Sequence, residues 1–183
     1  EAGANGFVHL PVDEVPNDRL LEAIADQGMF VSPNLSLARH EGLRLIEDPR
    51  LGPMLTDSEI QNLRRWRANR RESGDEIQYA ALIACHDAGV PILAGSDAPN
   101  GGTTVGATLH MELQLLVEAG LTPIEALRAA TSNPVSAFGL KDRGRIAEGL
   151  IADLVLVDGA PDQDITDTRN IVKIWQRGIP HPK

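Results

Sequence analysis

The sequence predicts an α/β protein in which short parallel strands are covered by helices. Three short apolar runs, at residues 7–8, 29–31 and 90–94, carry no charge and alternate with segments of helical periodicity. Uncharged strands that alternate with helices are typical of a parallel sheet buried on both faces. Because a three-stranded parallel sheet leaves an unpaired edge that must be covered, the pattern favours part of a barrel over a complete doubly wound domain.

The helices are predicted from apolar periodicity, N-terminal capping residues and C-terminal glycines. Thr56 with Glu59, and Ser73 with Glu76, fit the capping box that satisfies free amides at a helix start. Residues 33–56 are expected to form a long connection. The expected helices span residues 19–27, 57–71, 76–88, 109–117, a segment that starts at 123, and 134–139.

The C-terminal part of the chain is expected to be rich in β-strands. Glycines flank the first strand candidate, the second is a run of aliphatic residues, and the third is rich in Ile, Val and Trp. These candidates lie at residues 144–149, 154–157 and 171–177. The polar residues 158–167 are expected to form a turn. We therefore divide the chain into residues 1–140, which hold the parallel strands, and residues 141–183, which form a small β-rich part.

Composition excludes several classes of function. The net charge of −9 argues against nucleic-acid binding, which needs clustered Lys and Arg, and the basic stretch at 64–71 is interpreted as a solvated helix face. The chain has no run of about 18 apolar residues, so we expect no membrane span. Cys85, the only cysteine, lies on the apolar side of an expected helix and is assigned to the core. One cysteine is compatible with a cytoplasmic protein.

Two residues form a candidate catalytic constellation. His9 directly follows one short buried strand, and Asp97 follows another. In an α/β barrel the C-terminal ends of the strands converge on one rim, where catalytic groups lie. An imidazole and a carboxylate at that rim could bind zinc, and the carboxylate could accept a proton from water. From the residues alone the alternatives are favoured: a lone histidine after a strand is more often a hydrogen-bonded structural residue than a ligand, and Asp97 could be an aspartate in an Asx-turn.

Several segments together resemble one enzyme family. Residues 91–99 look like the last barrel strand of the amidohydrolase superfamily, and residues 110–113 and 118–131 resemble the helices that follow it. Asn133-Pro134 and residues 144–157 resemble the return of the chain into a small β-sandwich. The resemblance covers residues 6–178, and it is most specific over residues 91–157.

The resemblance implies a fold and a chemistry. The fold would be the last three strands of a TIM-type (β/α)8 barrel plus part of the small β-sandwich. In the imidazolonepropionase-like and Xaa-Pro-dipeptidase-like branch, His9 would be a metal ligand, and Asp97 would be a metal ligand and proton shuttle. The cofactor would be zinc or another divalent metal, with one or two ions in the complete enzyme. The reaction would be hydrolysis of a C–N bond in a small amide, cyclic amide or dipeptide.

The sequence also departs from the family pattern. The His-x-His pair of the first strand, the bridging lysine or carboxylate of strand four and the histidine of strand five are absent. We therefore expect this chain to supply part of an active site, to need a missing N-terminal half of the barrel, and to be inactive alone. The assembled protein is expected to be a homo-oligomer. A non-catalytic barrel remnant that binds no metal is the alternative.

Two further histidines are assigned provisional roles. His110 begins a helix after the last parallel strand, where it is as compatible with contact to substrate as with an ordinary hydrogen bond. His86 lies near the end of a helix, where a cation is favoured, and is interpreted as structural.

Overall fold

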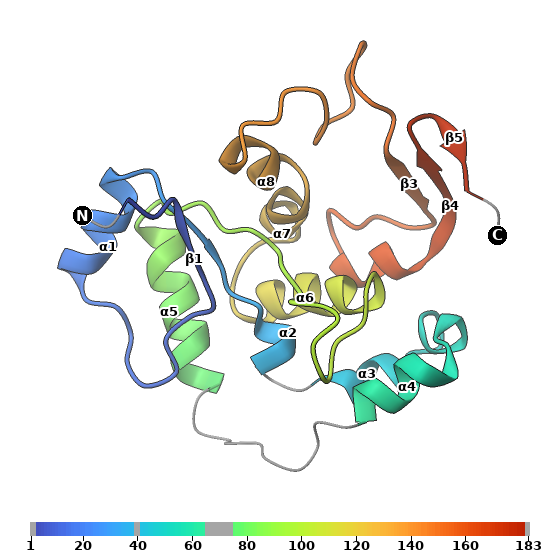
Figure 1. Ribbon diagram of the computed structural model, residues 1–183, viewed down its shortest axis with the longest axis horizontal. Helices are drawn as coiled ribbons and strands as arrows, with labels where there is room; N and C mark the ends of the chain where they lie inside the picture. The colour runs from blue at the N-terminus through green and yellow to red at the C-terminus, as the bar shows by residue number, and fades with distance from the viewer. Residues whose placement is uncertain (1–2, 39–40, 65–74, 182–183) are drawn as a thin grey trace.

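The computed structural model describes residues 3–38, 41–64 and 75–181 and confirms an α/β protein. Two small sheets lie on either side of a central helix, α6 (Figure 1). In chain order the elements are β1 (Gly6–Val8), α1 (Asp18–Asp26), β2 (Phe30–Ser32), α2 (Leu35–Ala38), α3 (Gly42–Glu47), η1 (Gly52–Met54), α4 (Asp57–Arg64), α5 (Asp75–Asp87), α6 (Ala107–Glu118), α7 (Pro123–Ala130), α8 (Ser132–Ala137), β3 (Leu154–Val157), η3 (Ile165–Arg169), β4 (Ile171–Gln176) and β5 (Ile179–Pro180).

The three predicted parallel strands lie side by side in chain order. β1 pairs with β2 in parallel, and Val31 of β2 forms a parallel bridge with Ile92. The Val31 amide donates to the Pro91 carbonyl (2.9 Å), and the Leu93 amide donates to the Val31 carbonyl (2.8 Å). The Ala94 amide donates to the carbonyl of Ala129 near the end of α7 instead of to a neighbouring strand, so the third strand is short.

The core lies between the parallel strands and the helices that follow them, with Leu21 and Ile24 of α1 in the same buried cluster. Helix α6 is central to it, and its Met111, Leu115 and Leu116 are fully buried. Cys85 of α5 is buried in the same cluster, as the sequence indicated, and burial raises the pKa of its thiol. Among the described residues, no helix is long and apolar enough to cross a membrane.

The capping residues begin their helices as expected. The Asn17 side chain accepts the Leu20 amide at the start of α1, and Thr122 forms a complete capping box with Glu125 at the start of α7. Thr56 and Glu59 exchange the same pair of hydrogen bonds before α4. The Ser73 capping box and residues 65–71 of the expected α4 helix lie outside the described residues.

The expected long connection at 33–56 is instead built from three short helices, α2, α3 and η1. Leu35 of α2, Leu45 of α3 and Leu51, which directly precedes η1, are almost completely buried. Helices this short are marginal in isolation and depend on tertiary packing. Their local periodicity was therefore too brief to predict them.

The second sheet is antiparallel, in the order β3-β4-β5. Its first two strands lie where the sequence indicated, but β5 has only two residues and was not expected. The strand candidate at 144–149 was wrong, because these residues form turns and Ile146 is 90% exposed. The turn expected at 158–167 runs into the 3-10 helix η3, which packs on α6.

An ion pair joins the end of α5 to the start of α7. His86 Nε2 lies 3.1 Å from Glu125 Oε1, and His86 Nδ1 lies 3.3 Å from Asp87 Oδ1. Burial opposes the charge on His86, but the hydrogen bonds to Asp87 and Glu125 outweigh it and raise the His86 pKa. Hydrogen bonds from Thr122, with a smaller contribution from His86, lower the pKa of Glu125 to about 2.

This pair predicts a pH dependence of folding. The raised His86 pKa gives stability that is present below the ordinary value of 6.5 and is lost as the pH rises through the folded-state value. The lowered Glu125 pKa gives stability that is present above 4.5 and is lost as the pH falls towards 2. In urea unfolding at pH 5.5 and 8.5, His86→Ala should destabilise the chain more at pH 5.5. An equal loss at both pH values would contradict the pairing.

Candidate functional site

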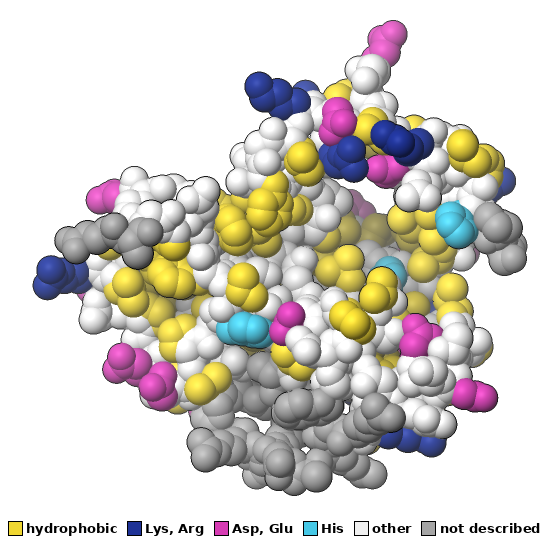
Figure 2. All heavy atoms as spheres, in the orientation of Figure 1, with side chains coloured by type: hydrophobic (Ala, Val, Ile, Leu, Met, Phe, Trp, Pro, Cys, Tyr) yellow, Lys and Arg dark blue, Asp and Glu magenta, His cyan; other side chains and the backbone are white. Residues whose placement is uncertain are grey.

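The structure brings the two residues of the predicted constellation together. His9 follows β1, Asp97 follows the third parallel strand, and His9 Nε2 lies 3.5 Å from Asp97 Oδ2. The side chains are 49% and 34% exposed, so both can reach a small molecule from solvent. The condition on which the sequence argument depended, a shared rim for these strand ends, is therefore met. Figure 2 shows the side chains of one face of the molecule by type.

The backbone at this rim is unusual. His9, Asn34 and Asp97 have φ values of 70°, 52° and 51°, and each follows one of the three parallel strands. Among the described residues, the one other non-glycine residue with positive φ is Arg177, in the turn between β4 and β5. Residues held in this sparsely populated region persist where the surrounding structure imposes it, and they cluster at functional sites. The positive φ values therefore occur at the ends of the same parallel strands that carry the His9–Asp97 pair.

Ser32, the last residue of β2, and Asn34 lie between the strand ends that carry His9 and Asp97, and we call these two residues the floor of the candidate site. The Ser32 hydroxyl donates to Asn34 Oδ1 (3.0 Å), and the Ser32 carbonyl accepts the His9 amide (2.8 Å). A side chain at Gly95 would overlap with both polar side chains, so a glycine is needed where the third strand passes them. Sequence reasoning missed Asn34, although asparagine tolerates positive φ and residue 34 lies two residues after the end of β2.

Helix α4 holds the loop that follows Asp97. The Asn62 side-chain amide donates to the carbonyls of Asn100 (3.0 Å) and Thr103 (2.8 Å). The Thr104 hydroxyl donates to Glu59 Oε1 (2.6 Å) and thereby lowers the pKa of Glu59. These contacts restrain the loop beside the rim from a helix that lies about forty residues earlier in the sequence.

The His9–Asp97 pair fits half of a metal site. An imidazole nitrogen and a carboxylate oxygen are both ligands that zinc accepts, and both are accessible here. Catalytic zinc usually has three protein ligands. Within residues 3–38, 41–64 and 75–181, no group of three His, Cys, Asp or Glu side chains is placed to hold a metal. The remaining ligands would have to come from other residues.

His110 makes the ordinary hydrogen bond that the sequence also allowed. It lies on α6, and its Nδ1 is 3.0 Å from the Thr168 hydroxyl of η3. That hydroxyl donates to the Ile165 carbonyl, so it accepts from His110. Burial, followed by the charge of Arg169, lowers the His110 pKa to about 4, which leaves the imidazole neutral at pH 7. The structure does not pair His110 with His9 or Asp97, and its contact with substrate stays a prediction.

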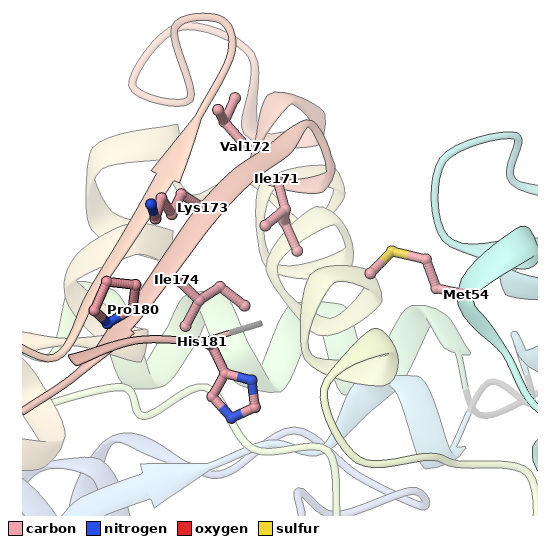
Figure 3. Close-up of a pocket in the computed structure, with 7 residues that line it drawn as sticks. All are labelled: Met54, Ile171, Val172, Lys173, Ile174, Pro180 and His181. Carbon is pink, nitrogen blue, oxygen red and sulfur yellow. The ribbon is translucent and has the colours of Figure 1, made fainter. Parts of the chain in front are cut away.

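A groove of about 860 Å³ lies on the second sheet rather than at the strand ends. Figure 3 shows Met54 of η1 facing side chains of β4 and the segment around β5. The groove is lined by Met54, Ile171, Val172, Lys173, Ile174, Pro180 and His181. Its lining is mainly aliphatic and does not include His9 or Asp97, so it is separate from the candidate site.

Curated relatives match the chain over part of its length. It is 44% identical over 71 residues to adenine deaminase 2 of Desulfotalea psychrophila, which is 39% of this chain and 11% of that protein. It is 40% identical over 86 residues to imidazolonepropionase of Paracoccus denitrificans, or 45% of this chain and 21% of that one. It is 35% identical over 97 residues to ochratoxinase of Aspergillus niger, which is 50% of this chain and 19% of that protein.

Solved structures match the whole chain but less than half of their own length. A Xaa-Pro dipeptidase with methionine bound in its active site superposes with a TM-score of 0.73 at 20% identity, covering 100% of this chain and 41% of that one. Ochratoxinase of A. niger superposes with a TM-score of 0.67 at 22% identity, covering 98% and 37%. At this identity the likeness shows the fold. The model of the amidohydrolase family matches residues 6–181, and this chain therefore belongs to the amidohydrolase family.

Proposed function

We propose that this chain supplies part of the active site of a metal-dependent hydrolase that cleaves C–N bonds in small amides, cyclic amides or dipeptides. The observation that carries the proposal is the 3.5 Å approach of His9 and Asp97 at the ends of two parallel strands. Relatives named imidazolonepropionase and Xaa-Pro dipeptidase support the substrate class. The family match supports the reaction type.

We infer that the parallel strands are the last three of a (β/α)8 barrel. Their order, β1, β2 and the segment at 91–94, is that of consecutive barrel strands, and helices follow the second and third. The β3-β4-β5 sheet would be part of the small β-sandwich. The chain covers 41% of the matched dipeptidase, which leaves room there for the remaining strands.

His9 Nε2 and Asp97 Oδ2 would hold the divalent ion, zinc or another first-row metal. A bound ion of this kind polarises a carbonyl group and lowers the pKa of water. Asp97 accepts the proton of the attacking water and returns it to the leaving nitrogen, because its carboxylate is accessible at the rim. Ser32 and Asn34 lie between the two strand ends, and the hydrogen bond from the His9 amide to the Ser32 carbonyl restrains the backbone of His9.

A complementary N-terminal half of the barrel is proposed as the partner. Among the residues that the structure describes, β1 has a strand neighbour on one side, β2, and its Phe7 and Val8 are 42% and 60% exposed. Exposed apolar side chains continue at Val12, Val15 and Leu20, and Figure 2 shows hydrophobic patches over the region of β1 and α1. An exposed strand edge beside apolar surface is a site for strand addition. The missing metal ligands would arrive on the same partner.

Metal analysis of the chain, alone and joined to an N-terminal barrel half, tests this function. We expect one or two zinc ions per assembled protein and at least a tenfold weaker zinc affinity after His9→Ala. Loss of a residue that only hydrogen-bonds a metal ligand already weakens metal binding by about 10- to 100-fold, and loss of a ligand should cost no less. His86→Ala is the matched control and should keep the metal. An assembled protein that holds no divalent metal would instead be a non-catalytic remnant.

A further inference from the structure

Glu112 of α6 is a carboxylate in the centre of the core. Its side chain is fully buried, as are those of Met111, Leu115 and Leu116 on the same helix. Its Oε1 accepts the Leu35 amide (3.0 Å), and its Oε2 accepts the Ser36 amide (2.7 Å). These amides belong to the first turn of α2, which lies 76–77 residues earlier in the chain. Both carboxylate oxygens are therefore used to hold one short segment.

A buried carboxylate is costly compared with an apolar side chain. Burial of a charged group is tolerated where hydrogen bonds replace its hydration. Leucine would fill a position on this apolar helix without that cost. The pair of amide hydrogen bonds is thus the physical reason for an acid here.

The segment held by Glu112 is continuous with the floor of the candidate site. Asn34 directly precedes Leu35, is 2% exposed and accepts the Ser32 hydroxyl. Both side chains abut Gly95, two residues before Asp97. The Ser32 carbonyl accepts the His9 amide. Movement of the start of α2 would therefore be passed to the backbone of both reactive residues.

We propose that Glu112 is a positioning residue, whose carboxylate clamps residues 32–36 and thereby sets the separation of His9 and Asp97. The proposal rests on the proposed function only in taking that pair as reactive. Glu112 itself does not touch the rim.

The protonation state of Glu112 gives the clamp a measurable signature. Burial raises the pKa of Glu112 to about 7, although the amide bonds from Ser36 and Leu35 oppose the rise. Protonation converts one oxygen into a donor that faces an amide N–H, so one of the two bonds is lost. The groups that face the carboxylate from α2 are uncharged. On α6, His110 and Gln114 turn instead to Thr168 and Arg169 of η3.

Amide NMR of the full chain between pH 5 and 9 tests the clamp without a substrate or a metal. In the wild type, the amide signals of Asn34, Leu35, Ser36 and Gly95 should move with a common midpoint near the Glu112 value of about 7. Glu112→Gln offers one acceptor oxygen and, in place of the second oxygen, an NH2 group that can only donate, so like the protonated acid it presents a donor to one of the two amides. The common midpoint should be lost, and the signals should stay near their low-pH positions. Glu118→Gln, on an exposed part of α6, is the control and should keep the midpoint.

The outcomes separate this proposal from the proposed function. A midpoint that persists at these amides in Glu112→Gln, or Asn34 and Gly95 signals that do not follow those of Leu35 and Ser36, would overturn the clamp while leaving metal binding intact. An absence of metal in the assembled protein would overturn the function while leaving the titration intact. If Glu112→Gln does not fold, Glu112→Asp is the second variant. It keeps the carboxylate but shortens the side chain by one methylene, which moves the carboxylate away from the amides of Leu35 and Ser36. The Asn34 and Gly95 signals should then shift, and unchanged signals would contradict the clamp.

Discussion

Replacement of Asp97 by asparagine in the assembled protein is expected to lower kcat/KM for amide hydrolysis by about 10²- to 10⁴-fold, the usual contribution of a general acid–base group. The amide has nearly the shape of the carboxylate but cannot accept a proton near neutral pH. It is also a weaker metal ligand because it carries no charge. The exposed position of Asp97 beside His9 means that the loss should be catalytic rather than structural.

The measurement is amine release from a panel of dipeptides, N-acyl amino acids and cyclic amides. Unfolding midpoints should be recorded for the same preparations, and these should agree between the wild type and Asp97→Asn. Asp26→Asn, at an exposed position of α1, is the matched control and should retain full activity. An Asp97→Asn protein that hydrolyses its substrate at the wild-type rate would remove Asp97 from the mechanism.

Replacement of Asp48 by alanine is expected to lower the free energy of unfolding by about 3–5 kcal/mol, as for other broken buried ion pairs. Asp48 Oδ2 lies 2.7 Å from Arg169 Nη1, and both side chains are almost completely buried. Its Oδ1 also accepts the backbone amides of Arg50 and Leu51. Alanine would leave the buried guanidinium of Arg169 and both amides without this acceptor. The pair joins the segment after α3 to η3, so its loss should loosen the contact between the two parts of the chain.

Urea unfolding measures this effect, and two further variants define it. Arg169→Met in the Asp48→Ala background should recover part of the lost stability, because it removes the uncompensated charge. Asp142→Ala is the control, since Asp142 pairs with Arg143 at the surface and should contribute nothing measurable. A loss below 1 kcal/mol in Asp48→Ala would show that the pair does not hold these elements together.

The same pair has a defined pH dependence. Burial opposes the charge on Asp48, but the amides of Arg50 and Leu51 and the guanidinium of Arg169 outweigh it and lower the Asp48 pKa to about 2. Because the folded-state value lies below the ordinary 3.8, the stability is present above that value and is lost as the pH falls towards 2. Asp48→Ala should remove this acid-dependent component from the unfolding curve.

Much of the local structure could be predicted because its causes are local. Asn17 and Thr122 satisfy amides three residues away, and the apolar periodicity of α6 spans three turns. The chain also places His9 and Asp97 directly after strands, and parallel strands in one sheet carry such residues to the same edge. The order of residues therefore placed the pair at one rim, and the resemblance to the amidohydrolase superfamily gave the reason to prefer the pair over the structural alternatives.

Other features had no local cause to detect. Helices α2 and α3 depend on leucines that are buried by distant segments, and the strand expected at 144–149 lacked a partner to pair with. Asn34 could be recognised only when Gly95 was seen to pass beside it. His110 could be given its hydrogen-bond partner only when η3 was placed on α6.

The sequence by itself determined the alternation of strands and helices, their capping, and the two residues that stand at strand ends. The tertiary structure decided which polar side chains are buried and what they hold. Glu112 bonds across 76–77 residues, and Arg169 bonds to Asp48 across 121. A capping motif satisfies its hydrogen bonds within one helical turn, whereas a buried carboxylate takes its donors from whichever segment the fold brings to it, and no spacing in the chain records that choice.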